Sequence, residues 1–367
     1  MQNYFKLLSA MLVGTSLFSC SVNNDYDFSK SIDDKITLGG DSLSLPCFST
    51  DTFSIGRIVD LGSQKNVFIN NDRNADYYYF YKESGLGSYE VYTTGPRELT
   101  ANVNSYIVVG KMPDLLNEDG TCLDVENLKL DLLINNPGGC KVDFTECKLI
   151  GAKNKDGRRI LTEIDVDGFT LPAHVDSFHV VFEELNEVLR NVPDTIYYSA
   201  VATESTDEMQ IYGYQLDLKY IIDAPFAFGD EFRVIYKDSI MEMNKNLDDF
   251  TPQTIVLRAE VENEIPLNVK LDLEAVDVDG KTMDDVTITV NGDIGAATAN
   301  FNGAATSPIS IVVKGKNRNS LTRFDGLRYS ATGYATNQQQ GLMLMGHQRL
   351  KVNKLKMTLV GGIDIDM

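Results

Sequence analysis

The chain has 367 residues and an acidic composition, with 33 Lys and Arg against 53 Asp and Glu, which gives a formal net charge of −20. Its 43% hydrophobic and 23% charged residues are typical of a globular protein and exclude a disordered or collagen-like chain. Binding to a nucleic-acid backbone needs clustered Lys and Arg, so the acidic balance argues against a nucleic-acid partner. The length predicts two or three domains.

Residues 1–19 have the pattern of a lipoprotein signal peptide. Lys6 precedes an apolar run from Leu7 to Phe18, which is too short for a membrane-spanning helix. The run ends in Leu17-Phe18-Ser19-Cys20, which resembles a bacterial lipobox. The resemblance implies cleavage before Cys20 and lipid attachment to its thiol, with acyl chains such as palmitate anchoring the mature protein. An ordinary signal peptide with an incidental Cys20 is the alternative.

The segment 20–30 is polar and without period, which predicts a flexible tether. The stretches Tyr26 to Asp33 (YDFSKSID) and Ile36 to Pro46 (ITLGGDSLSLP) resemble the mature N-terminus of a group of uncharacterised Bacteroidota cell-envelope lipoproteins. That group has no assigned enzyme activity, so the resemblance implies an outer-membrane lipoprotein of β fold and no particular chemistry. It leaves open whether the protein lies on the periplasmic or the cell-surface face.

Strand patterns dominate the remainder of the chain. Alternating runs such as Leu128 to Leu132 and Val286 to Val290 are separated by Asp-Gly and Asn-Gly pairs, which suit tight turns. Helical periodicity is scarce: its clearest case, Glu183 to Val192, ends before Pro193, and Asp51 to Leu61 is a second candidate for a short helix. The sequence predicts a mainly β protein of tandem β-sandwich-like domains, Ig-like or transthyretin-like, with one or two short helices.

Several residues recur in the same order in the second half of the chain. The matched pairs are Leu130 with Leu257, Asn136 with Asn263, Val142 with Val269, Ile164 with Ile288, Phe178 with Ile309 and Tyr198 with Tyr329. The recurrence predicts a tandem duplication, with β-sandwich repeat 1 at 120–250, repeat 2 at 251–367 and an N-terminal β-rich segment at 31–119. Chance alternation among strands is the alternative.

The aromatic run from Tyr77 to Tyr81 is the most distinctive local feature. On a strand, Tyr77, Tyr79 and Tyr81 share one face, opposite Tyr78 and Phe80. Tyrosine combines an apolar ring with a polar tip and is enriched at recognition surfaces, so these three are candidate ligand-binding aromatics. A strand packed on both sides is the alternative, and the pattern favours it.

The other candidate reactive or metal-binding residues do not match the spacing of a known catalytic or metal site. His174 and His179 would point to opposite faces of a strand, which predicts no metal site. Asp277 opens a run like a calcium loop, but Ile288 stands where the final carboxylate is needed. The remaining cysteines are Cys47, Cys122, Cys140 and Cys147, and we expect them to be free thiols. If a disulfide forms, Cys122 with Cys147 is the first pair to test.

These patterns predict an acyl-anchored cell-envelope lipoprotein that acts as a non-catalytic structural or adhesive interaction module, without a cofactor. It would contact the membrane through its N-terminal lipid and bind a protein or glycan partner. One alternative is a glycan-binding lipoprotein of a polysaccharide-uptake system, which requires a solvent-exposed, coplanar tyrosine platform. The other is a fimbrial-type subunit, with an exchangeable strand at Ile36 to Leu45 or Leu355 to Ile365.

Overall fold

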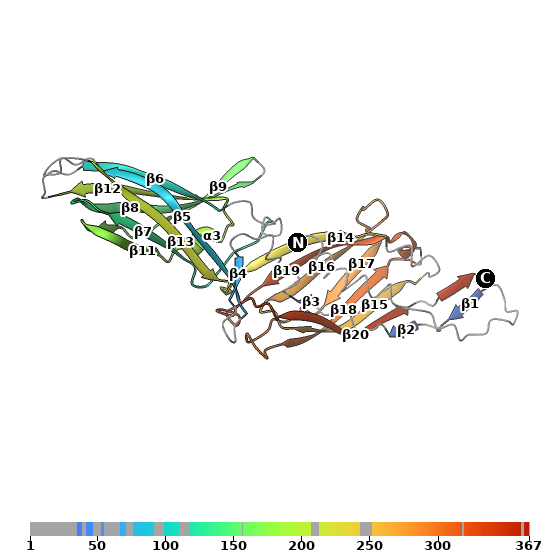
Figure 1. The fold of residues 1–367 in the computed structure, drawn as a ribbon. Helices are drawn as coiled ribbons and strands as arrows, with labels where there is room; N and C mark the ends of the chain where they lie inside the picture. Colours follow the sequence, from blue (N-terminus) through green and yellow to red (C-terminus); the bar gives the residue numbers. More distant parts are fainter. Residues whose placement is uncertain are drawn as a thin grey trace. The chain divides into compact units, whose positions relative to one another are not determined.

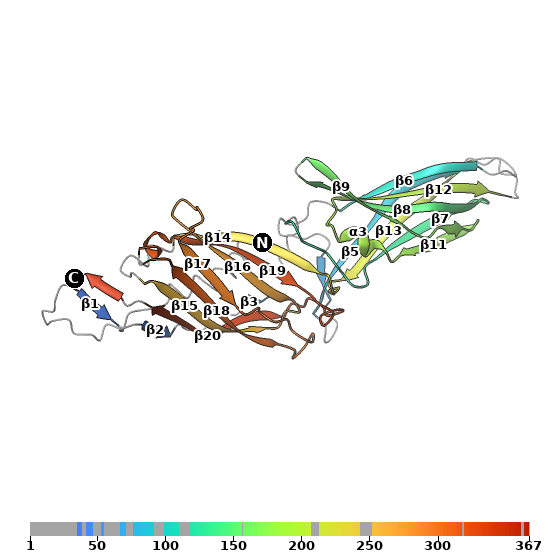
Figure 2. The same ribbon diagram turned by 180° about the vertical axis from the view of Figure 1, so that it is seen from behind.

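A computed structural model describes residues 35–38, 42–46, 53–54, 67–70, 76–91, 99–109, 118–155, 157–206, 213–242, 252–317, 319–360 and 363–366. Nearly all of the regular structure is antiparallel β-sheet (Figure 1 and, from behind, Figure 2). The predicted mainly β, sandwich-like fold with short helices is therefore confirmed. Cys20, the segment 20–30 and Cys47 lie outside the described residues.

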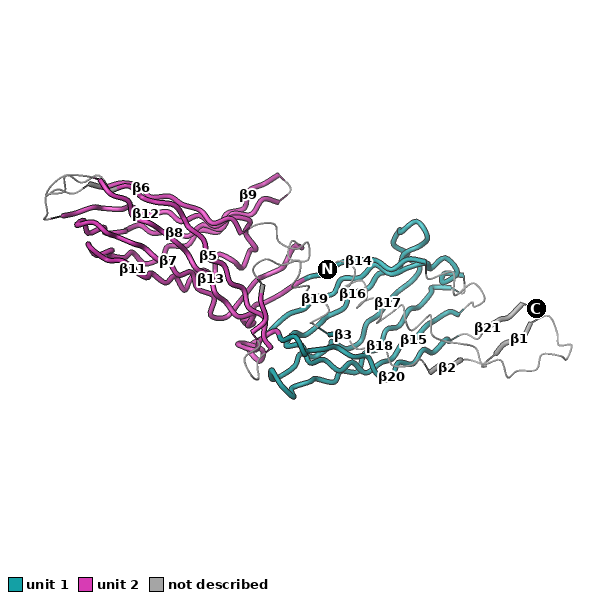
Figure 3. The backbone as a smooth tube through the Cα atoms, in the orientation of Figure 1, with its two compact units in different colours: residues 1–60, 235–335, 345–367 teal, residues 61–234, 336–344 magenta. Residues whose placement is uncertain are grey.

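The chain forms two compact units, shown in different colours in Figure 3. Unit 1 comprises residues 1–60, 235–335 and 345–367, and unit 2 comprises residues 61–234 and 336–344. This division differs from the three consecutive segments expected from the sequence, because unit 2 interrupts unit 1 along the chain.

Unit 2 is a sandwich of two sheets. Its strands are β4 (Val67–Ile69), β5 (Tyr78–Val91), β6 (Leu99–Val108), β7 (Lys129–Asn136), β8 (Lys141–Lys155), β9 (Arg158–Asp165), β10 (Phe169–Leu171), β11 (Val175–Phe182), β12 (Thr195–Ser205) and β13 (Tyr214–Pro225). One sheet has the order β10-β8-β12-β6, with β9 also on β8, and the other has the order β11-β7-β13-β5-β4. Among the described residues of this unit, α3 (Leu185–Leu189) is the one α-helix, and it lies within the predicted 183–192 segment.

Period-two alternation builds the core of unit 2. Along β7, Leu130, Leu132 and Ile134 are buried while the residues between them are more exposed, and β12 alternates in the same way. The helix α3 adds Leu185 and Val188, both fully buried, to this core. Gly151 of β8 lies under the helix, where a Cβ atom would come within 2.8 Å of the Val188 side chain.

Unit 1 is a second sandwich. Its strands are β1 (Lys35–Leu38), β2 (Ser42–Pro46), β3 (Phe53–Ser54), β14 (Arg233–Ile240), β15 (Thr254–Asn263), β16 (Asn268–Val276), β17 (Val286–Asn291), β18 (Ala305–Gly315), β19 (Gly326–Tyr334), β20 (Arg349–Val360) and β21 (Ile363–Asp366). The smaller sheet is β14-β19-β16, and the larger is β17-β18-β15-β20-β2 with β3 also on β20. β1 and β21 pair separately, and a 3-10 turn, η4, covers Leu321–Arg323.

The two units share one strand order. The succession β11-β7-β13-β5 in unit 2 corresponds to β18-β15-β20-β2 in unit 1, and β8-β12-β6 corresponds to β16-β19-β14. A duplicated unit would produce this agreement. The unit boundaries differ from the predicted repeats because each sandwich needs two strands from before its first matched residue. Unit 2 takes β5 and β6 from the segment 31–119, and unit 1 takes β2 from that segment and β14 from the end of repeat 1.

A buried asparagine occupies the same corner in both units. The Asn136 side chain donates to the carbonyl oxygens of Cys140 (2.9 Å) and Pro172 (2.6 Å), and its own oxygen accepts from the Gly138 amide. Asn263 makes the corresponding three bonds, donating to Leu267 (3.0 Å) and Gly295 (2.9 Å) and accepting from Ile265. Both side chains therefore tie a turn to the segment that crosses beside it.

The two units differ at one edge. In unit 2 the strand β9 forms a hairpin with β8, whereas in unit 1 the strand at the matching sequence position, β17, pairs with β18 of the opposite sheet. The Val269 amide and carbonyl of β16 bond to Ile294 on the side away from β19. Leu271 and Leu273 point their backbone groups to that same side, where the described residues supply no partner for them.

Candidate functional site

The predicted tyrosine strip lies at the β4 edge of the β11-β7-β13-β5-β4 sheet of unit 2. Tyr78 is buried in the core and Phe80 packs against it, so Tyr77, Tyr79 and Tyr81 share the outer face as the alternation predicts. All three are partly exposed rather than buried.

The rings of this strip do not form a flat platform. Those of Tyr77 and Tyr79 meet edge to face, with centroids 6.4 Å apart and planes at 61°. Phe68 of β4 lies opposite Tyr79 with a centroid separation of 5.6 Å, and Tyr81 donates a hydrogen bond to Glu83. Edge-to-face packing stabilises an aromatic cluster, but it does not present the coplanar surface that stacks against a sugar ring.

A second aromatic surface, which sequence reasoning missed, lies on the outer face of the β10-β8-β12-β6 sheet of unit 2. Tyr106 of β6 and Tyr197 of β12 are direct cross-strand partners, with ring centroids 6.2 Å apart. The Arg159 guanidinium lies 5.0 Å from the centre of the Tyr197 ring. The exposed fractions of the apolar side chains are high, at 61% for Tyr106, 54% for Val108 and 55% for Leu161. We call Tyr106, Val108, Arg159, Leu161 and Tyr197 together the Tyr106 face.

The strand register explains why this face is continuous. Thr195 lies between Val108 of β6 and Ala152 of β8, and Ala152 in turn lies opposite Leu161 of β9. Residues opposite one another in a sheet project to the same side, so Val108 and Leu161 join Tyr106 and Tyr197 on the outer surface. The alternation in β6 and β12 predicts that Tyr106, Val108 and Tyr197 share one face, but it does not indicate that this face is exposed.

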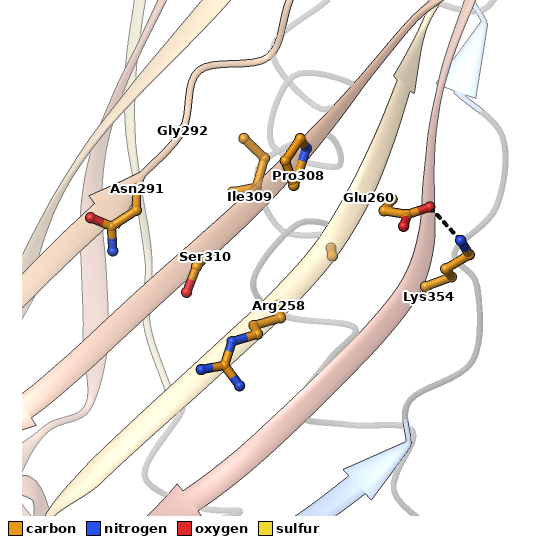
Figure 4. A pocket seen from close by; sticks show the side chains of 9 residues that line it. Arg258, Glu260, Asn291, Gly292, Pro308, Ile309, Ser310 and Lys354 are labelled. Atoms are coloured by element: carbon orange, nitrogen blue, oxygen red, sulfur yellow. Dashed lines mark ion pairs between the residues drawn. The ribbon is translucent and has the colours of Figure 1, made fainter.

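A shallow hollow of about 480 Å³ lies on the outer face of the larger sheet of unit 1 (Figure 4). It is lined by residues of β15, β17, β18 and β20, including Arg258, Asn291, Pro308 and Ser310. Glu260 and Lys354 form a 2.8 Å ion pair at one end. Figure 4 shows Arg258 directed toward the Ser310 side, away from that pair.

The remaining candidates have structural roles in the described residues. Cys122, Cys140 and Cys147 are free thiols, and burial raises the pKa of Cys147, whose sulfur lies 3.5 Å from the Tyr198 hydroxyl. The Asp277 carboxylate accepts the backbone amides of Asp279 and Lys281, as in a tight turn. No group of three or more His, Cys, Asp or Glu side chains in the described part of the chain could hold a metal ion.

Comparison with known proteins gives a similarity of fold alone. No protein family matches the chain, and no curated protein does. One similar solved structure is the crystal structure of a candidate secreted protein from Parabacteroides distasonis, at 14% sequence identity. The superposition has a TM-score of 0.58 and covers 88% of this chain and 100% of that one. Its source belongs to the Bacteroidota, the phylum that the N-terminal resemblance names.

Within the described residues, no helix has the length and apolar character needed to cross a bilayer.

Proposed function

We propose that this chain is a non-catalytic interaction module of the cell envelope, held at the outer membrane by acyl chains on Cys20, and that unit 2 binds a partner protein through the Tyr106 face. The exposure of Tyr106, Val108 and Leu161 on one regular sheet surface is the observation that carries the proposal. Apolar patches of this kind on soluble domains mark interaction sites, and Tyr and Arg are enriched where binding energy concentrates.

The anchoring part of the proposal rests on the lipobox-like Leu17-Phe18-Ser19-Cys20. The similarity in fold to a candidate secreted protein from the same phylum supports an envelope location. Cys20→Ala should remove the lipid and release the protein from the membrane fraction. Unchanged membrane fractionation of this variant would contradict the anchor. Protease treatment of intact cells then distinguishes the two faces of the membrane, because only a surface-exposed protein is degraded.

A photo-crosslinking amino acid at position 106 tests the binding face in the native envelope. We expect discrete adducts that disappear on protease digestion and that weaken when Val108→Ser and Leu161→Ser are introduced together. Position 278 serves as the control, because Val278 is 66% exposed in unit 1, outside the Tyr106 face. Equal adducts from both positions would refute a specific face, and protease-resistant adducts would favour a glycan partner.

Two alternatives make different demands on the structure. The glycan-binding hypothesis expects a flat tyrosine platform, and the 61° angle between Tyr77 and Tyr79 does not supply one. The fimbrial-type hypothesis expects an exchangeable strand at one end of the chain. In the structure, the segments it names bond to each other, β1 with β21 and β2 with β20.

A further inference from the structure

The hollow on unit 1 contains an uncompensated positive charge. Arg258 is exposed, and no ion pair or hydrogen bond joins its guanidinium to a described residue. Its direct cross-strand neighbours are Ser310 on β18 and Lys356 on β20. Lys356 is also exposed and has no partner among the described residues. Two cations thus lie opposite each other in a protein whose net charge is −20.

Such a pair is unfavourable in the absence of an anion. Like charges directly opposite on a sheet repel each other, and the destabilisation amounts to some tenths of a kcal/mol. With 53 carboxylates in the chain, a neutralising acid beside Arg258 would be easy to supply. Glu260, two residues along β15 on the same face, pairs instead with Lys354. The arrangement therefore leaves Arg258 and Lys356 able to bind a negatively charged group from outside.

The backbone around Arg258 builds the hollow. β17 ends at Asn291, and Gly292 has a φ of +94°, where a Cβ atom would come within 2.5 Å of the Pro308 carbonyl oxygen. Pro308 lies in β18 just past the end of the β17 pairing, where its missing amide costs no ladder bond on that side. On the other side, β20 bulges at Lys354, whose φ is +51°. Bulges are common beside functional sites.

The rim of the hollow suits a hydroxyl-rich ligand. The Asn291 amide and the Ser310 hydroxyl can each donate and accept hydrogen bonds, and the Glu260 carboxylate can accept them. Pro308 supplies apolar surface between these polar groups. The volume of about 480 Å³ lies within the usual range for small-ligand sites.

We propose that this hollow binds a carboxylated sugar residue of an acidic polysaccharide. The planar guanidinium of Arg258 holds the carboxylate through two parallel hydrogen bonds, which an ammonium group cannot form. Lys356 adds attraction from the neighbouring strand, and Asn291, Ser310 and Glu260 hold the hydroxyls. The site lies on unit 1 and is independent of the Tyr106 face, so either proposal can fail without the other.

Calorimetry with the full mature chain tests the site, using trigalacturonate as the acidic probe and galactotriose as its neutral counterpart. We expect trigalacturonate to bind, with an affinity that falls as salt increases, and galactotriose to bind at least about tenfold more weakly. Arg258→Gln should weaken trigalacturonate binding about tenfold, and Lys356→Gln should weaken it less. Lys314→Gln, on the same sheet face but outside the hollow, is the matched control and should leave binding unchanged.

Thermal unfolding without ligand separates a binding role from a structural one. Arg258→Gln removes a repulsive pair, so its melting temperature should not fall below that of the wild type. Absence of trigalacturonate binding, equal binding of galactotriose, or an unchanged affinity in Arg258→Gln would each overturn the proposal. Inorganic phosphate is the final probe, and displacement of trigalacturonate by phosphate at equal concentration would show a general anion site instead.

Discussion

At the scale of single residues, the clearest structural determinants are Asn136 and Asn263, each buried with two donated bonds and one accepted bond to the backbone. Their side chains satisfy carbonyl and amide groups at a corner where no strand partner is available. Each unit therefore depends on one amide group to close a turn between two facing strands, β7 and β8 in unit 2 and β15 and β16 in unit 1.

Replacement of either asparagine should destabilise its own unit. We expect Asn136→Ala and Asn263→Ala each to lower the free energy of unfolding by about 2–3 kcal/mol, since three buried backbone partners are left unsatisfied. Asn→Asp at either position should cost more, because a carboxylate cannot donate to the two carbonyls. Urea denaturation measures the change, with Asn353→Ala, a half-buried strand residue, as the control. Equal small losses for all three alanine variants would contradict the assigned role.

Buried tyrosines predict how stability depends on pH. Burial, with smaller contributions from Cys147, raises the pKa of Tyr198 above its ordinary value, and burial followed by the Asp238 hydrogen bond does the same for Tyr236. A tyrosine in the unfolded chain ionises near pH 10. The stability these groups contribute is thus complete below about pH 10 and is lost as the pH rises further toward their folded pKa.

The measurement is urea unfolding across the alkaline range together with phenolate absorbance. We expect a flat unfolding free energy up to about pH 9 and a decline above about pH 10, of up to about 1.4 kcal/mol per pH unit for each protected tyrosine. Tyr198→Phe should make the decline shallower. A phenolate titration in the native state that matches free tyrosine would show that these rings are not protected.

At the scale of elements, the outer edge of β16 distinguishes unit 1 from unit 2. Its outward side chains, Lys270, Asp272 and Glu274, are exposed and charged, and charges on an open strand discourage pairing with another chain. Thr at all three positions should therefore promote self-association, measured by light scattering after size exclusion. Asp143→Thr is the control, because Asp143 of β8 has strand neighbours on both sides, Thr170 and Thr203. A monomeric triple variant would contradict this role.

The sequence predicted the elements better than their partners. Alternation located most strands and the inward faces of β7 and β12, and the Asn136 and Asn263 match marked equivalent corners. It could not show that β9 and β17 join opposite sheets, because pairing across a sandwich is set by the whole fold. The match of Phe178 with Ile309 is also off by two residues. Ile309 pairs with Ala259, whose equivalent in unit 2 is Leu132. The residue opposite Leu132 is Val180, not Phe178.

The same reasoning explains the outcome for the candidate sites. The tyrosine strip was found because five consecutive aromatic residues stand out in any sequence. Arg258 and Lys356 are separated by most of unit 1 along the chain and become neighbours only through the β15 and β20 register. Whether they have a counter-charge depends on which strands pair in the folded sheet, so no local sequence pattern predicts it.

At the scale of the whole molecule, the interrupted unit 1 predicts which fragments can fold. A fragment of residues 120–250, the predicted first repeat, lacks β5 and β6 and with them the buried Tyr78, Val103 and Ile107. We expect it to remain unfolded, whereas residues 61–242 should show a cooperative thermal transition by circular dichroism. Cooperative unfolding of the 120–250 fragment would refute the unit boundaries found in the structure.

The pairing of β2 with β20 also sets the order in which the molecule can be completed. The chain is made from its N-terminus, so Ser42–Pro46 is present long before Arg349–Val360. Residues 61–234 are made between these two strands. Unit 2 has most of its strands early and can collapse while the chain is still emerging. This early strand must wait for nearly the last one, so an envelope chaperone that shields an unpaired leading strand would benefit unit 1 far more than unit 2.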